Sequence, residues 1–407
     1  MPDSPDSPPD DDEVTALLEP PGGVSAPLTT PEQIADLARR LSSAEGPVAI
    51  DAERASGYRY SPRAHLIQLN RRGVGTVLID PIEVPDLSSI GEALRGVEWV
   101  IHAASQDLAC LAETGMRPDR LFDTELGGRI AGLERVSLGR MTELLLKISL
   151  AKGHSAADWS IRPLPRDYLV YAALDVEILL DLRDEVEALL DKQGKLGWAH
   201  EEFESVRTAP PPPPRVNPWR RTNGIQAVKD RPGLAIVRAL WESRDEIAKR
   251  TDLAPGKVLP DRLIVAAAIA KPKHMGAMLD LDGFTRRGVI THRKRWLEAI
   301  NAALGLPETE LPPRREPTDP SAPPSRWMSK EPKVAEFFAT AREVVLALSE
   351  ELSIPAENIV PPTAIRSLAW QHPEHVDTES VDAFLAAEGA RPWQRALVAE
   401  RIAAALN

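Results

Sequence analysis

The amino-acid sequence predicts an α/β domain, with a mixed sheet flanked by helices, followed by two small all-α domains. Short apolar, β-like runs alternate with amphipathic helical segments up to about residue 206. The rest of the chain has helical periodicity and contains one order of segments twice, about 100 residues apart. Two proline-rich stretches separate these parts. The 407-residue chain is therefore expected to form three folded units.

The elements of the first unit follow from capping signals and periodicity. Thr30 followed by Pro31 is an N-cap and first-turn signal that predicts a helix to about Leu41. Apolar runs predict strands, and amphipathic segments predict helices, of which the last is expected to be the longest. The predicted strands cover 47–51, 64–69, 76–79, 99–102 and 121–123, and the predicted helices cover 87–94, 106–113 and 166–190.

The second and third units resemble each other. In each, a segment that begins with Arg and an acid is followed by two short proline-containing segments, an apolar helix and a further proline. This order predicts a duplicated helical domain. The prolines of the first copy are Pro255, Pro260 and Pro272, and those of the second are Pro355, Pro361 and Pro373.

Composition sets the boundaries between these units. The start of the chain combines Pro, Ser and acids, which cannot bury enough apolar surface to fold, so we expect a disordered acidic tail. Five consecutive prolines predict a stiff linker, and a later stretch with seven prolines predicts a second linker. The predicted parts are the tail 1–22, the α/β domain 23–206, a linker 207–228, a helical domain 229–306, a linker 307–325 and a second helical domain 326–407.

Charge is unevenly distributed along the chain. The formal net charge is −12, which alone disfavours a nucleic-acid partner, yet residues 215–306 hold 18 Lys and Arg against 9 Asp and Glu. This middle unit is expected to track a phosphate backbone with little sequence readout, while Trp296 is expected to belong to its core. The candidate contacts in this unit are Lys271, Lys273, Arg286, Arg287, Arg293, Lys294 and Arg295.

The compartment is inferred from what the sequence lacks. Its single cysteine, Cys110, cannot form an internal disulfide, and its first residues contain neither a basic nor an apolar targeting segment. No run approaches the roughly 18 apolar residues that a membrane helix needs. No glycine-rich phosphate-binding fingerprint occurs. These features predict a cytoplasmic protein that does not associate with a membrane and does not use a nucleotide cofactor.

Acidic residues recur at positions suited to metal binding. Asp51 and Glu53 stand two apart at the end of a predicted buried strand, so both side chains point to one face. Asp107 is expected in the first turn of a helix that Ser105 caps. Converging carboxylates are costly to bury unless a cation lies between them. Taken singly, each acid is typical of a solvated surface.

A tyrosine and a fourth acid share one face of the last helix. Tyr171 and Asp175 are four residues apart, so their side chains stack, and the small residues Ala172 and Ala173 between them would allow close approach of a ligand. The order of the three pieces, a strand-end pair, a helix start and a Tyr/Asp face, is more informative than any one of them.

These pieces resemble the exonuclease motifs of the ribonuclease D family, in the tyrosine-bearing branch of the DnaQ-like, ribonuclease H-like superfamily. The motifs are VAIDAERASGYRYSPRAHLIQL, IHAASQDL and ADWSIRPLPRDYLVYAALDV, and the resemblance covers about residues 28–205. The basic unit is similar to the helicase-and-RNase-D C-terminal (HRDC) domain, and 326–407 is similar to a weaker second copy. The resemblance implies a ribonuclease H-like fold for the first unit.

The resemblance also implies a site and an activity. Metal ligands would be Asp51, Glu53, Asp107 and Asp175, binding two Mg²⁺ or Mn²⁺ ions, with Tyr171 orienting the attacking water. The protein would be a monomeric 3′–5′ exoribonuclease that releases nucleoside 5′-monophosphates from RNA ends, including tRNA precursors. Where the family has Asp-Thr-Glu-Phe, this chain has Ala52 and Arg54. Ala52 is expected to face away from the metals, whereas Arg54 and His102 are candidate contacts to RNA.

Two alternatives remain open at this point. The same four acids also serve DNA exonucleases, and a requirement for the 2′-hydroxyl cannot be read from the sequence. A catalytically silent RNA-binding scaffold is a different class, which the presence of all five motif residues disfavours.

Overall fold

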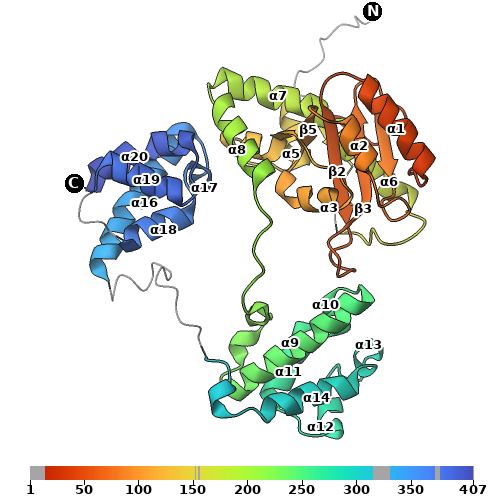
Figure 1. Cartoon of the computed structure of the whole chain (residues 1–407), viewed down its shortest axis with the longest axis vertical. Helices are drawn as coiled ribbons and strands as arrows, with labels where there is room; N and C mark the ends of the chain where they lie inside the picture. The colour runs from red at the N-terminus through yellow and green to blue at the C-terminus, as the bar shows by residue number, and fades with distance from the viewer. Residues whose placement is uncertain (1–13, 152, 155, 315–330, 372–375, 407) are drawn as a thin grey trace, which may run out of the picture.

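The computed structural model describes residues 14–406, except for 152, 155, 315–330 and 372–375. Figure 1 shows an α/β unit, a helical unit joined to it by an extended segment, and a second helical unit that ends the chain. The predicted fold class is confirmed.

A mixed five-stranded sheet forms the centre of the first unit. Its strand order is β4-β3-β2-β5-β6, with antiparallel pairing from β4 to β2 and parallel pairing from β2 to β6. The central strand is therefore the one with the two acids. The strands are β2 (Val48–Arg54), β3 (Ala64–Arg71), β4 (Gly75–Ile79), β5 (Glu98–Ile101) and β6 (Arg120–Asp123).

Helices cover both faces of the sheet. On one face, α1 (Pro31–Ser43) and α2 (Ser88–Ala93) bury their apolar sides against alternate residues of β2 and β3. Thr30 forms a capping box with Gln33 at the start of α1, as the cap signal predicted. On the other face lie α4 (Thr124–Ile130), α5 (Leu138–Leu145), α6 (Arg166–Glu177), α7 (Leu179–Lys192) and α8 (Leu196–Thr208).

The prediction of one helix over 166–190 is wrong, because the chain turns between α6 and α7. Ile178, with φ −96° and ψ −5°, is a single turn residue that ends α6 and precedes α7. The break lets α6 lie across β2, β3 and β4 while α7 packs on α4. Glu177 holds the end of α6 by accepting hydrogen bonds from Asn70 on β3 and Thr76 on β4.

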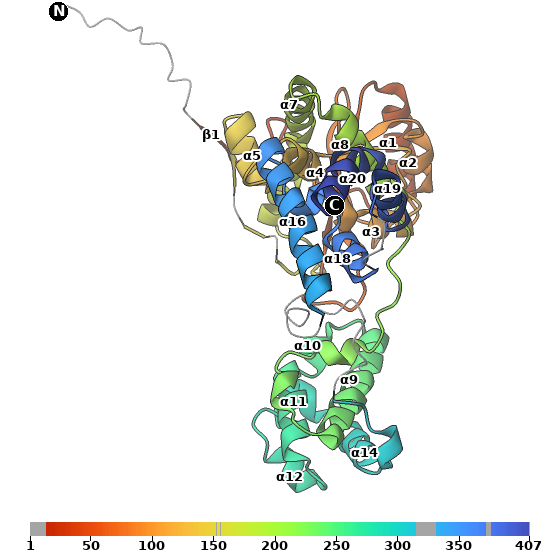
Figure 2. The same cartoon turned by 90° about the vertical axis from the view of Figure 1, so that its left-hand side faces the viewer.

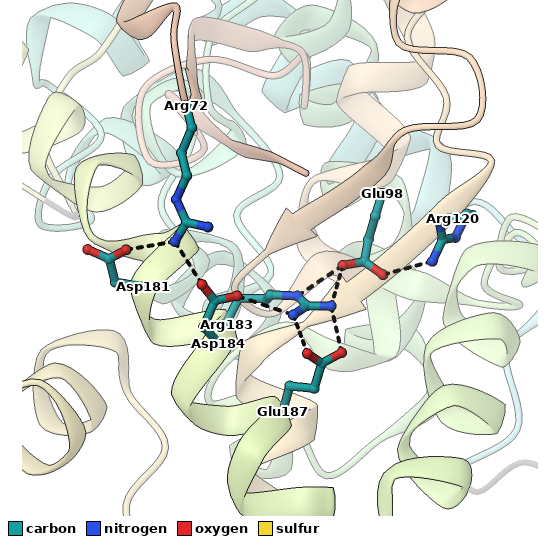
Figure 3. Close-up of polar contacts among 7 residues, drawn as sticks. All are labelled: Arg72, Glu98, Arg120, Asp181, Arg183, Asp184 and Glu187. Atoms are coloured by element: carbon teal, nitrogen blue, oxygen red, sulfur yellow. Dashed lines mark hydrogen bonds and ion pairs between the residues drawn. The ribbon is translucent and has the colours of Figure 1, made fainter. Parts of the chain in front are cut away.

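An ionic network fixes α7 near the end of the sheet where β2 and β5 begin, which is the end away from Asp51 and Glu53 (Figure 3). The Arg183 guanidinium lies between Glu98 on β5 and Glu187 one turn along α7, at 2.9 and 2.5 Å. Arg72, which follows β3, pairs with Asp181 and Asp184. Because Glu98 and Arg183 are largely buried, these contacts define the position of α7 better than exposed pairs would.

Part of the predicted tail is ordered, so that prediction is wrong for the residues that follow position 13. Strand β1 (Thr15–Leu17) pairs in parallel with β7 (Ile148–Leu150), and Arg166 binds Glu19. Backbone pairing between two three-residue strands explains why composition alone missed them. Residues 1–13 lie outside the described part of the chain.

The linkers are shorter than composition indicated. Trp219, in the first predicted linker, is buried against α9 (Arg231–Thr251). Arg231 donates to the carbonyl oxygens of Glu308, Leu311 and Pro312 in the second. These flanking residues therefore belong to the middle unit. The rest of the second linker, 315–325, lies outside the described residues.

The middle unit contacts the loop that follows β2 (Figure 1). The backbone carbonyl oxygen of Tyr58 accepts a hydrogen bond from the Ala254 amide at 3.0 Å. The ammonium of Lys257 lies 4.0 Å from the centre of the Tyr58 ring. The amide of Ser61 donates to Asp252 at 2.9 Å. The helices of this unit are α9, α10 (Pro255–Val258), α11 (Asp261–Ala270), α12 (Met275–Leu279), α13 (Arg287–Ile290) and α14 (Arg293–Leu304).

The third unit packs on the first, and Figure 2 shows α20 in front of α8. Residues of both units form one continuous apolar cluster. A Cβ at Gly132 would lie 2.5 Å from the carbonyl oxygen of Ser353, so only glycine fits at this contact. The helices of this unit are α16 (Pro332–Leu352), α17 (Ala356–Ile359), α18 (Pro362–Gln371), α19 (Thr378–Ala387) and α20 (Pro392–Leu406).

A buried carboxylate joins these two units. Glu202 on α8 receives both arms of the Arg391 guanidinium at 2.5 Å and the indole N–H of Trp393 at 2.9 Å. Trp393 also stacks on Trp198, with ring centres 5.2 Å apart. At a second point, the Lys195 ammonium donates to the carbonyl oxygen of Leu352.

Candidate active site

The central strand β2 directs Asp51 and Glu53 to the face of the sheet that α6 covers. The period of two places Ala52 on the other face, in the apolar cluster beneath α1, as predicted. Opposite Asp51 on β3 stands Gln68. Because β2 lies in the middle of the sheet, burial of both carboxylates follows from the strand order.

Asp107 reaches the site from a turn after β5, and the predicted capping is wrong. Asp107 itself occupies the N-cap position of α3 (Leu108–Glu113), while Ser105 lies in a preceding 3₁₀ turn, η1 (Ala104–Gln106). Asp123 organises this turn by accepting the amides of Ala103 and Ala104 at 3.0 and 2.8 Å. The Asp107 carboxylate makes no capping bond and is free to face the cleft.

The single cysteine of the chain lies one turn after Asp107. Cys110 is 3% exposed, and its thiol donates to the backbone carbonyl of Asp107. Burial is the main reason that the pKa of this thiol rises to about 12. The thiol therefore stays protonated and belongs to the core.

Helix α6 brings Tyr171 and Asp175 over the strand-end acids. The two side chains are close enough for the phenol to lower the pKa of the Asp175 carboxyl, although burial raises that pKa overall. Together with β2 and the Asp107 turn, they enclose a cleft of about 350 Å³. All five predicted site residues line this cleft, with Arg54, His102, Ala52, Ala103, Gln106, Leu138 and Leu179.

Three of the carboxylates form a compact oxygen cluster. Each of Asp51, Glu53 and Asp175 offers an oxygen within 4.8 Å of the other two. Asp107 is not in that group, and its Oδ1 lies 3.3 Å from a guanidinium nitrogen of Arg54. The cleft thus contains three acids that face one another and a fourth that faces a cation.

Burial and mutual repulsion dominate the electrostatics of this cleft. Desolvation raises the pKa of Asp51 to about 6 and, together with the charge of Asp51, raises that of Asp107 to about 8. The same causes raise the pKa of Glu53 to about 10 and shift that of Asp175 well upward. Ionised carboxylates at this density require a positive charge, and a hard divalent cation takes such oxygen ligands. The donor set fits a divalent metal.

These shifts predict how pH affects the metal-free protein. In the unfolded state these carboxylates titrate near pH 4. Between that pH and their raised pKa values, the folded protein binds more protons through Asp107 and Glu53 than the unfolded chain does. The free energy of unfolding therefore falls as the pH rises through this interval. The buried His65 and His102, whose pKa values fall to about 4, oppose this trend only below about pH 6.5. From pH 6.5 to 8.5 in chelator, the melting temperature should fall, and added Mg²⁺ should remove the slope. A flat profile in chelator would contradict the expected repulsion.

The predicted RNA contacts fall into two groups. Arg54 and His102 line the cleft, and the seven cations of the middle unit lie on its surface or at helix ends. Lys271 and Arg295 already pair with Asp230 and Glu246. Within the described residues, the others have no acidic partner. Trp296 is fully buried and donates to the Val289 carbonyl, so it belongs to the core as predicted.

Two residues near the acids were not predicted as parts of the site. Gln68 is fully buried beside Asp51, and neither atom of its amide has a partner in the described structure. Asp123 is the buried acceptor that shapes the Asp107 turn. For Gln68, the available signal was a polar residue within the apolar run Leu66-Ile67-Gln68-Leu69. A capping acid at the end of β6 was the signal for Asp123.

Family comparisons agree with this geometry. A model described as 3′–5′ exonuclease matches residues 26–191, an HRDC domain model matches 233–300, and a 3′ to 5′ exonuclease C-terminal domain model matches 321–406. Across the described residues, no helix is both long and apolar enough to span a membrane.

Individual relatives extend the match over most of the chain. A ribonuclease D from a Shewanella species is 30% identical over 318 residues, which cover 76% of this chain and 77% of that protein. The crystal structure of Escherichia coli RNase D aligns with a TM-score of 0.63 and 26% identity, covering 89% of this chain and 99% of the other. A protein from Bifidobacterium adolescentis aligns with a TM-score of 0.88 and 35% identity, covering 97% and 100%. The chain belongs to the ribonuclease D family.

Proposed function

We propose that this protein is a 3′–5′ exoribonuclease that removes nucleoside 5′-monophosphates from RNA ends with the help of two divalent ions, Mg²⁺ or Mn²⁺. The observation that carries the proposal is the convergence of four carboxylates and a phenol, from β2, the Asp107 turn and α6, on one cleft. The family of this protein also favours RNA as the substrate, because the solved E. coli relative is described as an exoribonuclease involved in structured RNA processing.

The carboxylates divide into two groups by position. Asp51, Glu53 and Asp175 would hold one ion, and Asp51 together with Asp107 would hold the second. When bound, such a pair of ions makes a water more acidic and stabilises the oxygen that leaves in a phosphodiester displacement. Asp51 is the residue common to both groups, so the proposal depends on it most.

Tyr171 orients the attacking water. Burial and the nearby carboxylates raise the pKa of its phenol above the ordinary value, so the hydroxyl keeps its proton at neutral pH. A protonated phenol donates and positions rather than abstracting a proton. Its position on α6, one turn before Asp175, places it beside the acids of the cleft.

The basic middle unit supplies affinity for RNA. We propose that Lys273, Arg286, Arg287, Arg293 and Lys294 contact phosphates most directly, because in the described structure they have no acidic partner, whereas Lys271 and Arg295 are already paired. Such contacts release counterions and make binding dependent on salt.

Neutralising part of this surface should change that salt dependence. If Arg286, Arg287 and Lys294 are replaced together by Ala, the slope of log affinity against log salt for single-stranded RNA should fall by about 2, at roughly 0.7 per phosphate contact. Fluorescence anisotropy between 50 and 300 mM salt would measure it. The matched control is Arg342→Ala, which removes an exposed cation from the acidic third unit and should leave the slope unchanged. Equal slopes in all three proteins would exclude the middle unit as a phosphate-binding surface.

The activity itself can be tested with end-labelled oligonucleotides. The protein is incubated with 5′-labelled RNA or with DNA of the same sequence, with Mg²⁺, Mn²⁺ or chelator. The proposal predicts single-nucleotide shortening from the 3′ end of RNA, only with metal, and nucleoside 5′-monophosphates as products. Equal shortening of DNA would favour a DNA exonuclease, and binding without shortening would favour a silent scaffold.

Further parts of the proposal concern the context of the enzyme. We infer that tRNA precursors are among its substrates, that it acts in the cytoplasm, and that it works as a monomer. We also infer that 326–407 is a second HRDC-like copy. In its support, α9 and α16 both have 21 residues, α10 and α17 both have 4, and α11 and α18 both have 10.

A further inference from the structure

The guanidinium of Arg54 lies inside the acidic cleft, immediately after the two strand-end acids. Pairing between β2 and β3 is irregular here, because Glu53 lies opposite Leu66 while Arg54 lies opposite Ala64. From this position the side chain reaches Asp107, at 3.3 Å. The arginine therefore crosses the end of the central strand to meet the acid that stands apart from the other three.

Arg54 is the one permanent cation among the residues that line the cleft. The other basic residue there is His102, and burial lowers its pKa to about 4, so the ring is neutral. Its Nδ1 also pairs with the Thr124 hydroxyl at 2.9 Å. Arg54 thus carries the whole positive charge that the cleft offers to four carboxylates.

The pair with Asp107 is loose enough to exchange. The Arg54 side chain is 28% exposed, and in the described structure its only polar contact is Asp107. The contact lacks hydrogen-bond geometry, since Asp107 Oδ1 is buried without a hydrogen-bond partner. A guanidinium held by one imperfect contact can rotate to another anion at small cost, and its planar fork suits a phosphate.

We propose that Arg54 is an exchangeable counter-ion: it pairs with Asp107 in the metal-free protein and moves to a phosphate at the RNA 3′ end when Asp107 turns to a metal. This inference rests on the proposed function, since it assumes that the cleft takes metal and RNA. It assigns one residue two duties: Arg54 neutralises part of the acidic cluster when no metal is bound, and it binds the substrate. It also makes metal and RNA binding cooperative, because the metal releases the group that binds RNA.

Metal titration tests the first duty without any measurement of activity. Arg54→Gln removes the competing charge, so Mn²⁺ should bind roughly tenfold more tightly by calorimetry, about the effect expected for losing one close charge pair. In chelator the variant should melt at a lower temperature than the parent, and with saturating Mn²⁺ the two should melt together. Arg54→Lys, which keeps the charge, should lie between them. The control is Arg63→Gln, which removes an exposed arginine whose one ion pair among the described residues is with half-buried Asp252 at 3.5 Å.

A charge-deleted RNA tests the second duty. The probe is an oligonucleotide that carries an uncharged methylphosphonate at the last or the penultimate linkage. With Mn²⁺ present, the parent protein should lose roughly tenfold in affinity for one of the two probes, whereas Arg54→Gln should bind charged and uncharged RNA equally.

Several outcomes would overturn the inference. Unchanged Mn²⁺ affinity in Arg54→Gln, or equal methylphosphonate losses in both proteins, would show that Arg54 is only a fixed structural partner of Asp107. If the parent protein fails to shorten unmodified RNA with metal, the proposed function fails. If the parent shortens RNA but the titrations of the variant match it, only the counter-ion role fails.

Discussion

Replacing Asp51 by Asn should abolish RNA hydrolysis while the protein stays folded and still binds RNA. Asp51 is the acid shared by both proposed metal positions, so its loss removes several kcal/mol of transition-state stabilisation, or at least about 10³-fold in rate. The fold should stay intact, because Asn has nearly the same shape as Asp and removes a buried charge. Burial already disfavours that charge, since it raises the pKa of the Asp51 carboxyl to about 6. In chelator at pH 8, this variant should melt no lower than the parent.

The matched control for this experiment is Asp36→Asn. Asp36 lies on α1, is mostly exposed and, among the described residues, pairs only with Arg39 one turn away, so its replacement should leave turnover unchanged. Single-turnover shortening of end-labelled RNA with Mg²⁺ measures the rate, and anisotropy measures binding. Retained turnover in Asp51→Asn would disprove the metal assignment, and lost binding would indicate a wider disturbance of the cleft.

Replacing Glu202 by Ala should release the third unit from the exonuclease domain. Glu202 is 4% exposed and accepts three hydrogen bonds from Arg391 and Trp393. Its removal leaves the Arg391 guanidinium without its carboxylate partner and the Trp393 indole N–H unpaired in a largely apolar interface, which costs about 3–5 kcal/mol of docking free energy. We expect a lower first transition in urea, faster proteolysis between the units and a red shift of tryptophan emission, since Trp198 and Trp393 stack there.

Glu204→Ala is the control for that prediction. Glu204 is two residues further along the same helix and is mostly exposed. In the part of the chain that the structure describes, its carboxylate pairs only with Arg207, so its loss should cost less than about 1 kcal/mol. Glu202→Gln should lie between the two, because an amide still accepts from Trp393 but loses the charge. If Glu202→Ala and Glu204→Ala unfold alike, the buried carboxylate contributes nothing to the interface.

The fold class and the five strands of the central sheet could be predicted from local signals, whereas the five site residues also required the resemblance to the ribonuclease D family. Period-two spacing placed Asp51 and Glu53 on one face, and period-four spacing did the same for Tyr171 and Asp175. These patterns are set by backbone geometry within one element. They survive packing because a buried strand and a helix face have few alternatives.

The errors arose where distant contacts override a local pattern. The turn at Ile178 interrupts a run that is helical on both sides, because α6 and α7 pack against different partners. Asp107 became the N-cap because Asp123, on a neighbouring strand, binds the amides before it. The pairing of Arg54 with Asp107 joins residues that are far apart in the sequence. Such contacts leave no periodic trace in the sequence.

The buried Cys110 makes the chain a built-in probe of its own local unfolding. It is the only thiol in the sequence, and it lies on the short helix α3, whose N-cap is Asp107. A thiol reagent can react with the folded protein only in moments when this helix opens, so the labelling rate reports the free energy of that opening. Ligands that clamp Asp107 would slow the labelling, and no engineered dye or altered residue is needed to follow them.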